Sequence, residues 1–385
     1  MLYSPREDSY LLAKWVRKLA FGKVLDMGSG SGIQAEAALA SEKVMSVLAA
    51  DIDPEAVALL TSKGIAAMQS DLFSKVQGKF DTIIFNPPYL PEGPGYKDIA
   101  LDGGKKGHEV LGTFLAQLNA HLKPDGITLI IFSSFTGKEK IDALIAHYGL
   151  EYKLLEAQHI SFEDLYVYAI RKTAFTKLLE KKGITGVELL AKGHRGLIFT
   201  GILGKKKVAV KVQRQDIDAR GTVDNETKRL RQLNKHGIGP KLLFSGKDYF
   251  VYEYVQGRFI EEYAASASRK DILRIVKDVF LQMRTLDKLG LNKEEMHHPH
   301  KHVLVAAKGK TTTAVLLDFE RCKPGKKVHN VTQFCQFLRS GRFNGLLRRR
   351  GIHIKGEKLT ALARVYKQEM DERRFREILR QFYSF

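Results

Sequence analysis

The stretch at residues 80–91, FDTIIFNPPYLP, decides how the first part of this chain folds. Its β-branched and aromatic residues predict a short buried strand, and the two prolines after Asn86 prevent a strand or a helix from continuing. An amide side chain and the ring of Tyr89 therefore follow the carboxyl end of a strand, where open α/β sheets bind their ligands. A proline turn with a packed tyrosine is the structural alternative for the same residues.

Upstream, residues 23–32, KVLDMGSGSG, predict an apolar strand that ends in a glycine-rich loop. The strand carries Asp26, and the loop carries Gly28 and Gly30. Glycines let the backbone turn tightly and approach a ligand, while a carboxylate at the strand end can pair with a cation. Such loops also bind dinucleotides or form purely structural turns, so the loop alone does not specify its ligand.

Two further predicted strands end in acidic residues, at Asp51 and at Asp71. A carboxylate about twenty residues after a glycine-rich loop commonly accepts hydrogen bonds from ribose hydroxyls. The alternation of strands and helices predicts an α/β fold with a doubly wound sheet, in which these polar residues meet at one edge.

The length and charge of the chain predict more than one domain. A chain of 385 residues is longer than a single hydrophobic core usually supports. Residues 1–172 contain 18 Lys and Arg against 21 Asp and Glu, whereas residues 173–385 contain 45 against 22. The basic second half favours an anionic partner such as RNA or a ribosome, with solvated lysines as the alternative.

The remaining composition favours a cytoplasmic protein. The two cysteines, Cys322 and Cys335, cannot form a disulfide framework and fit a reducing cytosol. The most apolar run, residues 127–132, is too short to span a bilayer, so no membrane contact is expected.

Residues 1–172 resemble the HemK/PrmC protein-glutamine methyltransferases, which depend on S-adenosylmethionine. The resemblance rests on six segments in family order, namely PREDS, LDMGSGSG, ADIDPEA, SDLF, FNPPYLP and ALDGGKKGHEVL. It implies a Rossmann-like class I methyltransferase domain of the archaeal and eukaryotic branch. The implied acceptor is the GGQ glutamine of a class I release factor. The implied partner is a small zinc-binding activator subunit, unless the second half of the chain takes its place. Enzymes that methylate adenine N6 or guanine N2 in RNA or DNA share the NPPY motif, so a base amine is the alternative acceptor.

The same resemblance implies roles for individual residues. It implies that the cofactor contacts Ser9, Asp26, Gly28, Gly30, Asp51, Asp71, Leu72 and Asn86. A carboxamide nitrogen is a poor nucleophile, so it must be oriented toward the methyl group. The Asn86 oxygen and the Pro87 carbonyl can accept its two N–H groups, and Tyr89 can stack on the amide plane.

In the second half, residues about 185–340 resemble the RIO-like predicted archaeal serine/threonine kinases. The resemblance implies an α+β protein-kinase-like domain that binds ATP and Mg²⁺. The implied nucleotide site contains Gly193, Gly196, Lys211, Glu226, Glu253, His297, His302 and Asp318, with Asp318 as the metal ligand. His297 stands where the catalytic Asp is usual and His302 where the metal-binding Asn is usual. A nucleotide-sensing or RNA-docking module without kinase activity is therefore the alternative.

Two other segments of this half remain to be interpreted. The run of histidines in HHPHKH, residues 297–302, could chelate a transition metal, although a polar loop explains it more simply. Residues 341–385 predict a basic helical extension with one helix at 358–382, which either contacts RNA or is simply solvated. The predicted domains are therefore residues 1–172 and 185–340, with a linker at 173–184 and the extension at 341–385.

Overall fold

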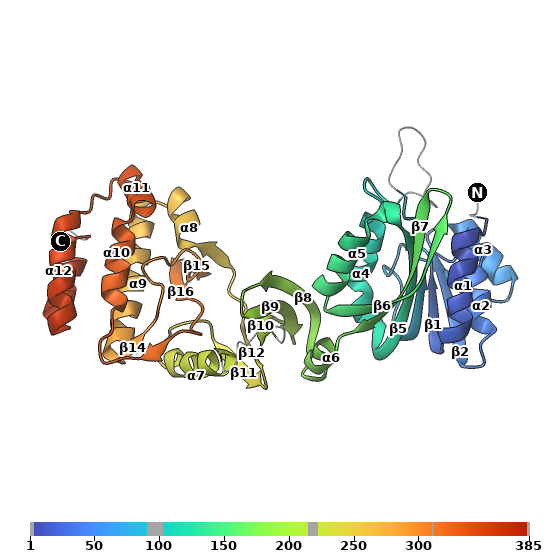
Figure 1. Ribbon diagram of the computed structural model, residues 1–385, viewed down its shortest axis with the longest axis horizontal. Helices are drawn as coiled ribbons and strands as arrows, with labels where there is room; N and C mark the ends of the chain where they lie inside the picture. Colours follow the sequence, from blue (N-terminus) through green and yellow to red (C-terminus); the bar gives the residue numbers. More distant parts are fainter. Residues whose placement is uncertain (1–3, 91–102, 215–221, 310, 383–385) are drawn as a thin grey trace. The chain divides into compact units, whose positions relative to one another are not determined.

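The computed structural model describes residues 4–90, 103–214, 222–309 and 311–382 (Figure 1). The chain divides into two compact units. The first comprises Met1–Leu190 and Thr200–Lys205, and the second comprises Ala191–Phe199 and Lys206–Phe385. Across the described ranges, no helix combines the length and the apolar character that crossing a membrane requires.

The first unit is built on a seven-stranded sheet in the order β3-β2-β1-β4-β5-β7-β6. Strands β1 to β5 pair in parallel, whereas β7 runs antiparallel to both β5 and β6. The strands are β1 (Gly22–Met27), β2 (Val44–Asp51), β3 (Ala66–Gln69), β4 (Phe80–Phe85), β5 (Leu122–Ser133), β6 (Leu150–Ile160) and β7 (Glu163–Lys172). The predicted Rossmann-like sheet is confirmed, and its strand order reverses between β1 and β4.

Apolar residues bury both faces of this sheet. Successive strand residues point to opposite faces, so Ile84 packs in one core and Ile83 in the other. Helices cover the sheet, and they are α1 (Glu7–Leu19), α2 (Ile33–Leu39), α3 (Pro54–Ser62), α4 (Glu109–His121) and α5 (Lys138–His147). Burial on both faces explains why the central strands are apolar runs rather than alternating ones.

Beyond the sheet, α6 (Ala174–Lys181) leads into a five-stranded sheet in the order β11-β12-β10-β9-β8. The strands are β8 (Ile184–Lys192), β9 (Gly196–Leu203), β10 (Lys206–Gln213), β11 (Leu242–Gly246) and β12 (Tyr249–Glu253). The division between the two units falls within β8 and β9. Helix α7 (Thr222–Asn234) contacts β10, β11 and β12.

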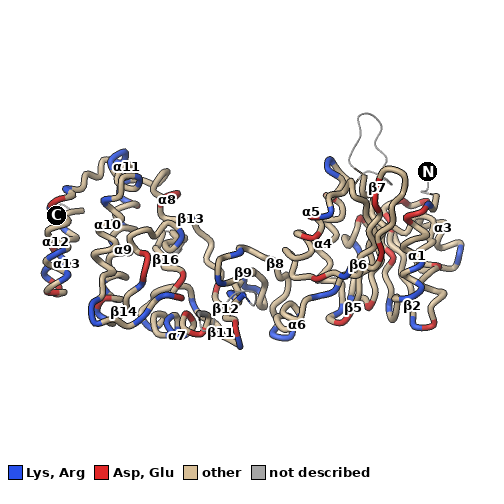
Figure 2. Tube along the Cα trace, viewed as in Figure 1, with Lys and Arg blue, Asp and Glu red and all other residues tan. Residues whose placement is uncertain are grey.

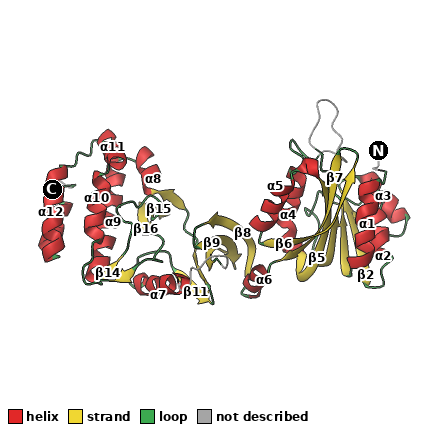
Figure 3. Ribbon diagram, in the orientation of Figure 1, coloured by secondary structure: helices red, strands yellow, loops and turns green. Residues whose placement is uncertain are grey.

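The rest of the second unit is mostly helical (Figure 3). Its helices are α8 (Ile260–Ser266), α9 (Arg269–Lys288), α10 (Asn330–Arg339), α11 (Gly341–Arg349), α12 (Gly356–Glu369) and α13 (Glu372–Leu379). Short antiparallel pairings join β13 (Gly257–Phe259), β15 (Val303–Lys308) and β16 (Thr311–Leu316), and separately β14 (Leu291–Asn292) and β17 (Lys323–Pro324). The second unit thus combines antiparallel sheets with a helical core, which fits the predicted α+β class.

The predicted single helix at 358–382 is wrong, because the chain forms α12 and α13 instead. Met370 adopts a left-handed conformation with φ of 49° and ends α12. Asp371 then caps α13, since its side chain accepts a hydrogen bond from the Arg374 amide at 2.7 Å. Leu359, Ile378 and Phe382 are buried, so one face of each helix packs into the core of the unit.

One buried polar network joins α9, α10 and α12. The Asp287 carboxylate accepts hydrogen bonds from Asn330 Nδ2 at 2.7 Å and from the Tyr366 hydroxyl at 2.9 Å. Asp287 is 4% exposed, and the Asn330 amide donates to it as well, at 3.1 Å. A buried carboxylate with several donors contributes to stability because its removal leaves all of those donors unpaired.

We therefore expect Asp287→Ala to lower the free energy of unfolding of the second unit by about 3–5 kcal/mol. The change leaves Asn330 and Tyr366 without their common acceptor. Chemical denaturation of the full chain measures the loss. The matched control is Glu357→Ala, an exposed acidic residue in the first turn of α12, which should change stability by less than about 0.5 kcal/mol. Equal effects of the two variants would contradict a structural role for the network.

Candidate functional site

Asn86 lies at the point where the strand order of the first sheet reverses. It directly follows β4, and β4 pairs with β1 so that Ile84 lies opposite Asp26. The glycine-rich loop after β1 is therefore at the same edge of the sheet as Asn86. This is the arrangement that the sequence predicts for the motif.

The side chain of Asn86 is held in one orientation by Asp8. Asn86 Nδ2 donates to Asp8 Oδ2 at 2.9 Å, and a carboxylate can only accept, so the amide nitrogen must face Asp8. Asn86 Oδ1 is buried and has no hydrogen-bond partner among the described residues. The Tyr89 hydroxyl also donates to Asp8 Oδ2, at 3.4 Å. The arrangement leaves an amide oxygen oriented to accept a hydrogen bond from a ligand.

Asp8 is a functional residue that the sequence analysis missed. It lies in the first turn of α1, is 4% exposed, and accepts a further bond from the Ser9 hydroxyl at 3.2 Å. An acidic residue at a helix start is normally explained by the helix dipole, which hid this role. The available signal was its place in PREDS, directly before Ser9.

Asp26 is almost fully buried, with 1% exposure, and neither carboxylate oxygen meets a hydrogen-bond donor among the described residues. Burial raises the pKa of Asp26 to about 8. The Ala35 amide and the Ser29 hydroxyl lie close enough to oppose this rise in part, although neither forms a hydrogen bond of ordinary geometry, and the negative charge of Asp51 adds slightly to it. A buried carboxylate without donors is costly unless a ligand supplies a positive charge or a hydrogen bond. The residue therefore fits a cationic ligand group at the end of β1.

Asp51 organises the glycine-rich loop. Its Oδ2 accepts from the Gly30 amide at 2.8 Å, and its Oδ1 accepts from the Asp53 amide at 2.9 Å. Gly28 and Gly30 have φ of 62° and 49°, in the left-handed region that glycine adopts without strain. At Gly28, a Cβ atom would lie 3.3 Å from the Phe85 ring, so the loop passes close to the end of β4.

The remaining predicted residues of this site lie near the same edge. Ser9 is buried on α1, and its carbonyl accepts from Gln34 Nε2 at 2.9 Å. Asp71 is exposed just beyond β3, and Leu72 after it has φ of 43°, which is uncommon for a leucine. Pro87 is buried between Asn86 and Pro88.

A second polar cluster lies in the second unit around Lys211 on β10. Lys211 Nζ lies 2.5 Å from Glu226, 3.2 Å from Asp318 and 3.6 Å from Glu320. Burial alone would lower the pKa of Lys211, but the three carboxylates raise it overall. The structure thus brings together Lys211, Glu226 and Asp318, three of the residues that the kinase resemblance implies.

Asp318 has an unusual backbone conformation. Its φ is 61°, in the left-handed region, and such strain in a non-glycine residue is concentrated at functional sites. Lys293, which is fully buried, donates from Nζ to the Asp318 carbonyl at 2.5 Å. The Glu226, Asp318 and Glu320 carboxylates lie within 4.8 Å of one another, so their oxygen atoms suit a hard cation such as Mg²⁺.

The histidines of the second unit divide between two places. His302 Nδ1 lies 3.9 Å from Asp318 Oδ2, and its Nε2 lies 3.2 Å from Glu295. Burial lowers the pKa of His302 below its usual value, which favours the neutral ring. His297 is exposed, with its ring 4.5 Å from that of His298. Within the described part of the chain, these histidines form no group that could hold a metal ion.

Three residues near Asp318 had escaped the sequence analysis, namely Lys293, Glu295 and Glu320. The kinase resemblance aligned His297 with the usual catalytic Asp, and Glu295 and Lys293 precede His297 by two and four residues, outside that alignment. Glu320 was hidden because a carboxylate two residues after a strand-end aspartate is common on any surface.

Gly196 and Glu253, which the kinase resemblance also implies, lie on the two strands next to Lys211. Gly196 begins β9 and Glu253 ends β12, and both strands pair with β10. The Gly193 amide donates to the Gly196 carbonyl at 2.9 Å, which closes the turn between β8 and β9. A Cβ atom at Gly196 would lie 3.1 Å from the Val212 carbonyl, so a larger residue would push the turn away from β10. Glu253 ends β12 and forms ion pairs with Lys206 and Lys241, at 3.4 Å and 3.8 Å.

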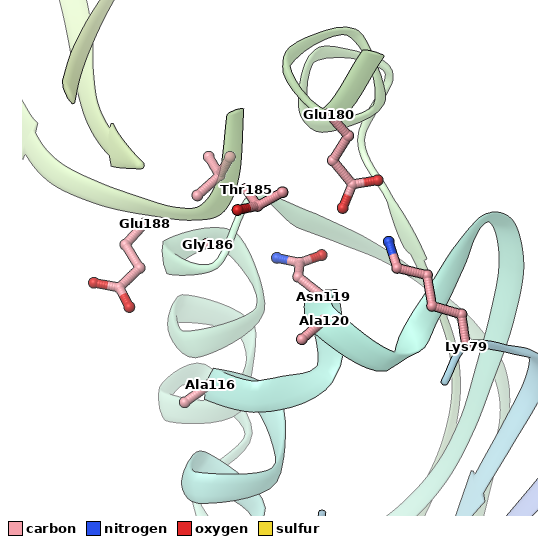
Figure 4. Close-up of a pocket in the computed structure, with 9 residues that line it drawn as sticks. Lys79, Ala116, Asn119, Ala120, Glu180, Thr185, Gly186 and Glu188 are labelled. Atoms are coloured by element: carbon pink, nitrogen blue, oxygen red, sulfur yellow. The ribbon is translucent and has the colours of Figure 1, made fainter. Parts of the chain in front are cut away.

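A hollow of about 380 Å³ lies elsewhere in the first unit (Figure 4). Figure 4 shows the side chains of Lys79, Asn119 and Glu180 pointing toward one another in this hollow. Lys79 directly precedes β4 whereas Asn86 directly follows it, so the hollow is at the opposite end of the strand from Asn86. The chemistry of the site therefore does not depend on this hollow.

Comparisons with known proteins agree with the geometry of the first unit. The family model described as the methyltransferase small domain matches residues 7–160. A putative protein N5-glutamine methyltransferase of Methanocaldococcus jannaschii is 36% identical over 177 residues, which cover 43% of this chain and 89% of that protein. A release factor glutamine methyltransferase of Deinococcus radiodurans is 30% identical, and the match spans about half of its length, 49%, and 31% of this chain.

Among solved structures, a chain of the E. cuniculi Mtq2–Trm112 complex is 23% identical, with a TM-score of 0.39. The match covers 45% of this chain and 99% of that one. The family assignment rests on the family model and on the archaeal relative, both of which match the unit that contains Asn86. Through its first unit, the chain belongs to the family of methyltransferases that includes this archaeal putative protein N5-glutamine methyltransferase.

Proposed function

We propose that the first unit transfers a methyl group from S-adenosylmethionine to the side-chain nitrogen of a protein glutamine. The observation that carries the proposal is the orientation of Asn86, whose Oδ1 atom is buried and unpaired while Asp8 holds its nitrogen. An acceptor amide presents two N–H groups, and Asn86 Oδ1 with the Pro87 carbonyl can accept both. The nitrogen lone pair then points at the sulfonium methyl, and the proton leaves after transfer.

The cofactor has a natural place at the same edge. Asp26 is suited to the ammonium of its amino acid part, because that carboxylate is buried without donors. Asp51 retains lone pairs for ribose hydroxyls, and Asp71 with the Leu72 amide is available for the adenine. S-adenosylmethionine supplies the activated methyl group, and the residues of this chain bind and orient it.

The acceptor is a glutamine of a class I release factor in this proposal. Two lines support it: the NPPY residues favour a planar amine or amide, and relatives with this motif are named as protein-glutamine or release factor methyltransferases. A base amine of RNA or DNA is the competing acceptor. Incubating the full chain with labelled cofactor and either release factor or total RNA decides which material gains the methyl group.

A small partner subunit is part of the same proposal. Strand β3 is at the edge of the sheet, and one apolar side chain is exposed at each end of the neighbouring β2, Met45 at 81% and Ile52 at 48%. Exposed apolar residues beside a sheet edge favour a protein that covers them. The chain described as part of the Mtq2–Trm112 complex belongs to such an assembly.

We further propose that the second unit binds ATP with Mg²⁺, either as a slow RIO-like protein kinase or as a nucleotide sensor. The observation that favours it is the meeting of Lys211, Glu226 and Asp318 from three separate elements. A lysine beside carboxylates can hold phosphates while the carboxylates hold the metal. Glu295 pairs with His302 and with Arg321, so its carboxylate is held at the side of this cluster.

The first prediction from the proposed functions concerns Asn86. We expect Asn86→Ala to lower kcat by at least about a hundredfold, because the acceptor amide loses an orienting hydrogen bond. Affinity for S-adenosylmethionine, measured by calorimetry, should stay within a few-fold. Gln117→Ala on α4 is the control and should leave kcat unchanged. Asp8→Ala should also lower kcat, yet add little in the Asn86→Ala background if the two residues act as one unit. Near-normal turnover of Asn86→Ala would refute the role.

The second prediction concerns Asp26 and pH. With a pKa of about 8 in the free protein, Asp26 is protonated at neutral pH, and a cationic ligand must favour its ionised form. Binding then releases a proton, so the Kd for S-adenosylmethionine should fall by up to about tenfold per pH unit as the pH rises from about 6 toward 8. Above about pH 8 the amino group of the ligand loses its own proton and the gain ends.

Calorimetry in two buffers with different ionisation enthalpies measures the released proton. Asp26→Asn should weaken binding and remove the pH dependence, while Asp53→Asn, outside the glycine-rich loop, serves as the control. A Kd that does not change with pH, together with no proton release, would show that no cation binds at Asp26.

The third prediction concerns Lys211 and Asp318. Calorimetry of the full chain should show saturable ATP binding in the presence of Mg²⁺, and Asp318→Ala should remove the dependence on the metal. Any phosphate transfer should disappear in Lys211→Ala and persist in Lys228→Ala, an exposed lysine on α7. Phosphate transfer that persists in Lys211→Ala would overturn the second proposal. Failure of the folded protein to bind ATP would overturn it as well.

A further inference from the structure

A groove of about 260 Å³ lies between α10 and α12 in the second unit. Each helix contributes one stripe of residues at helical spacing. The stripe of α10 is Thr332, Cys335, Gln336 and Arg339, and that of α12 is Thr360, Ala363, Arg364 and Lys367. Residues at i, i+3, i+4 and i+7 share a face of a helix, so the groove is the seam between two such faces.

The two helices run in opposite directions along this groove. Gly356, at the start of α12, is beside the end of α10, since a Cβ atom there would lie 3.3 Å from Arg339 Nε. Tyr366, near the end of α12, bonds the same Asp287 that bonds Asn330 at the start of α10. Arg339 and Lys367 therefore lie toward opposite ends of the groove, roughly 10 Å apart along its axis.

The charge of the groove is of one sign. Its cations are Arg339, Arg364 and Lys367, and all three are exposed. None of them forms an ion pair within the described part of the chain, and no described carboxylate lines the groove. Arg374 is a contrasting case in the same unit, because it forms ion pairs with Glu369 and Glu377. Three neighbouring cations without counter-charges repel one another, which favours an anionic ligand.

The polar residues between the cations suit a phosphate backbone. Guanidinium groups bind phosphate in a bidentate manner, and the Gln336 amide can donate to phosphate or ribose oxygens. The Thr332 and Thr360 hydroxyls donate to the His329 and Gly356 carbonyls, so their oxygens can accept hydrogen bonds from ribose hydroxyls. The apolar floor is formed by Cys335 and Ala363, which are 2% and 9% exposed. The groove thus offers positively charged sides and a shallow neutral floor.

The lining of the groove favours a nucleic-acid strand over two other anionic partners. Only Cys335 and Ala363 contribute apolar side chains, and both are buried, so an acidic amphipathic helix would find little apolar surface to cover. A flat bilayer cannot enter a concave seam between two helices. A single nucleic-acid strand is thin enough to do so, and the second half of the chain carries the excess of basic residues that would attract it (Figure 2).

We propose that the groove between α10 and α12 binds the sugar-phosphate backbone of single-stranded RNA, through Arg339, Arg364 and Lys367. The binding is independent of base sequence, because all the groups involved face phosphate or ribose. It is also separate from the Lys211 cluster, none of whose residues lines the groove.

The test measures RNA binding by the full chain. Fluorescence anisotropy of a labelled single-stranded RNA of mixed sequence reports the affinity. The variant is Arg339→Gln, Arg364→Gln and Lys367→Gln combined. The matched control is Lys228→Gln, Lys235→Gln and Lys247→Gln combined, which removes the same charge from exposed positions in the same unit. Circular dichroism and thermal denaturation establish that both variants are folded.

For three phosphate contacts to a single strand, log K should fall with log salt concentration with a slope of about −2 from this groove. We expect the groove variant to bind RNA at least about tenfold more weakly, and its slope to be less steep by about 2. The control should change both quantities much less. Equal losses in the two variants would show that only diffuse charge attracts RNA and would overturn the proposal. The proposal also fails if polyglutamate or anionic vesicles, rather than RNA, bind in a manner that depends on the groove residues.

Discussion

The hydrogen bond between Asp8 and Asn86 is the interaction on which the candidate methyl-transfer site depends. Asn86 ends β4 and Asp8 begins α1, so one carboxylate joins the amino-terminal helix to the switch point of the sheet. A side-chain amide can present either its nitrogen or its oxygen to a ligand, and only the carboxylate removes that ambiguity. The same carboxylate takes the Tyr89 hydroxyl, so the orientation of the whole motif follows from one buried anion.

The buried charges of the two units differ in how they are compensated. In the first unit, Asp26 forms no hydrogen bond of ordinary geometry among the described residues, and its raised pKa reflects its burial. In the second, Lys211 is surrounded by Glu226, Asp318 and Glu320. A carboxylate without a counter-charge favours the binding of a cation. In a site with three carboxylates and one ammonium, the ammonium could instead contact a phosphate and the carboxylates a metal ion.

The candidate sites were predictable to different depths. Strand ends, the glycine-rich loop and the NPPY motif are local signals, so the edge of the first sheet followed from residue order alone. Asp8 did not, because its partner Asn86 is 78 residues away in the chain. Likewise Lys293 contacts Asp318 only because β14 pairs with β17 and Asn330 of α10 accepts a hydrogen bond from the Lys293 amide. The break between α12 and α13 was missed because a left-handed methionine has no clear sequence signature.

By itself, the sequence determined the alternation of elements in the first unit, the acidic and glycine-rich strand ends, and the positive charge of the second half. These features depend on periodicity, turn-forming residues and composition, all of which are local or additive properties. Tertiary structure alone decided which way the Asn86 amide faces and which carboxylates surround Lys211. It also decided which arginines and lysines line one groove without ion pairs. Those outcomes depend on distances between residues far apart in the chain, and only packing sets such distances.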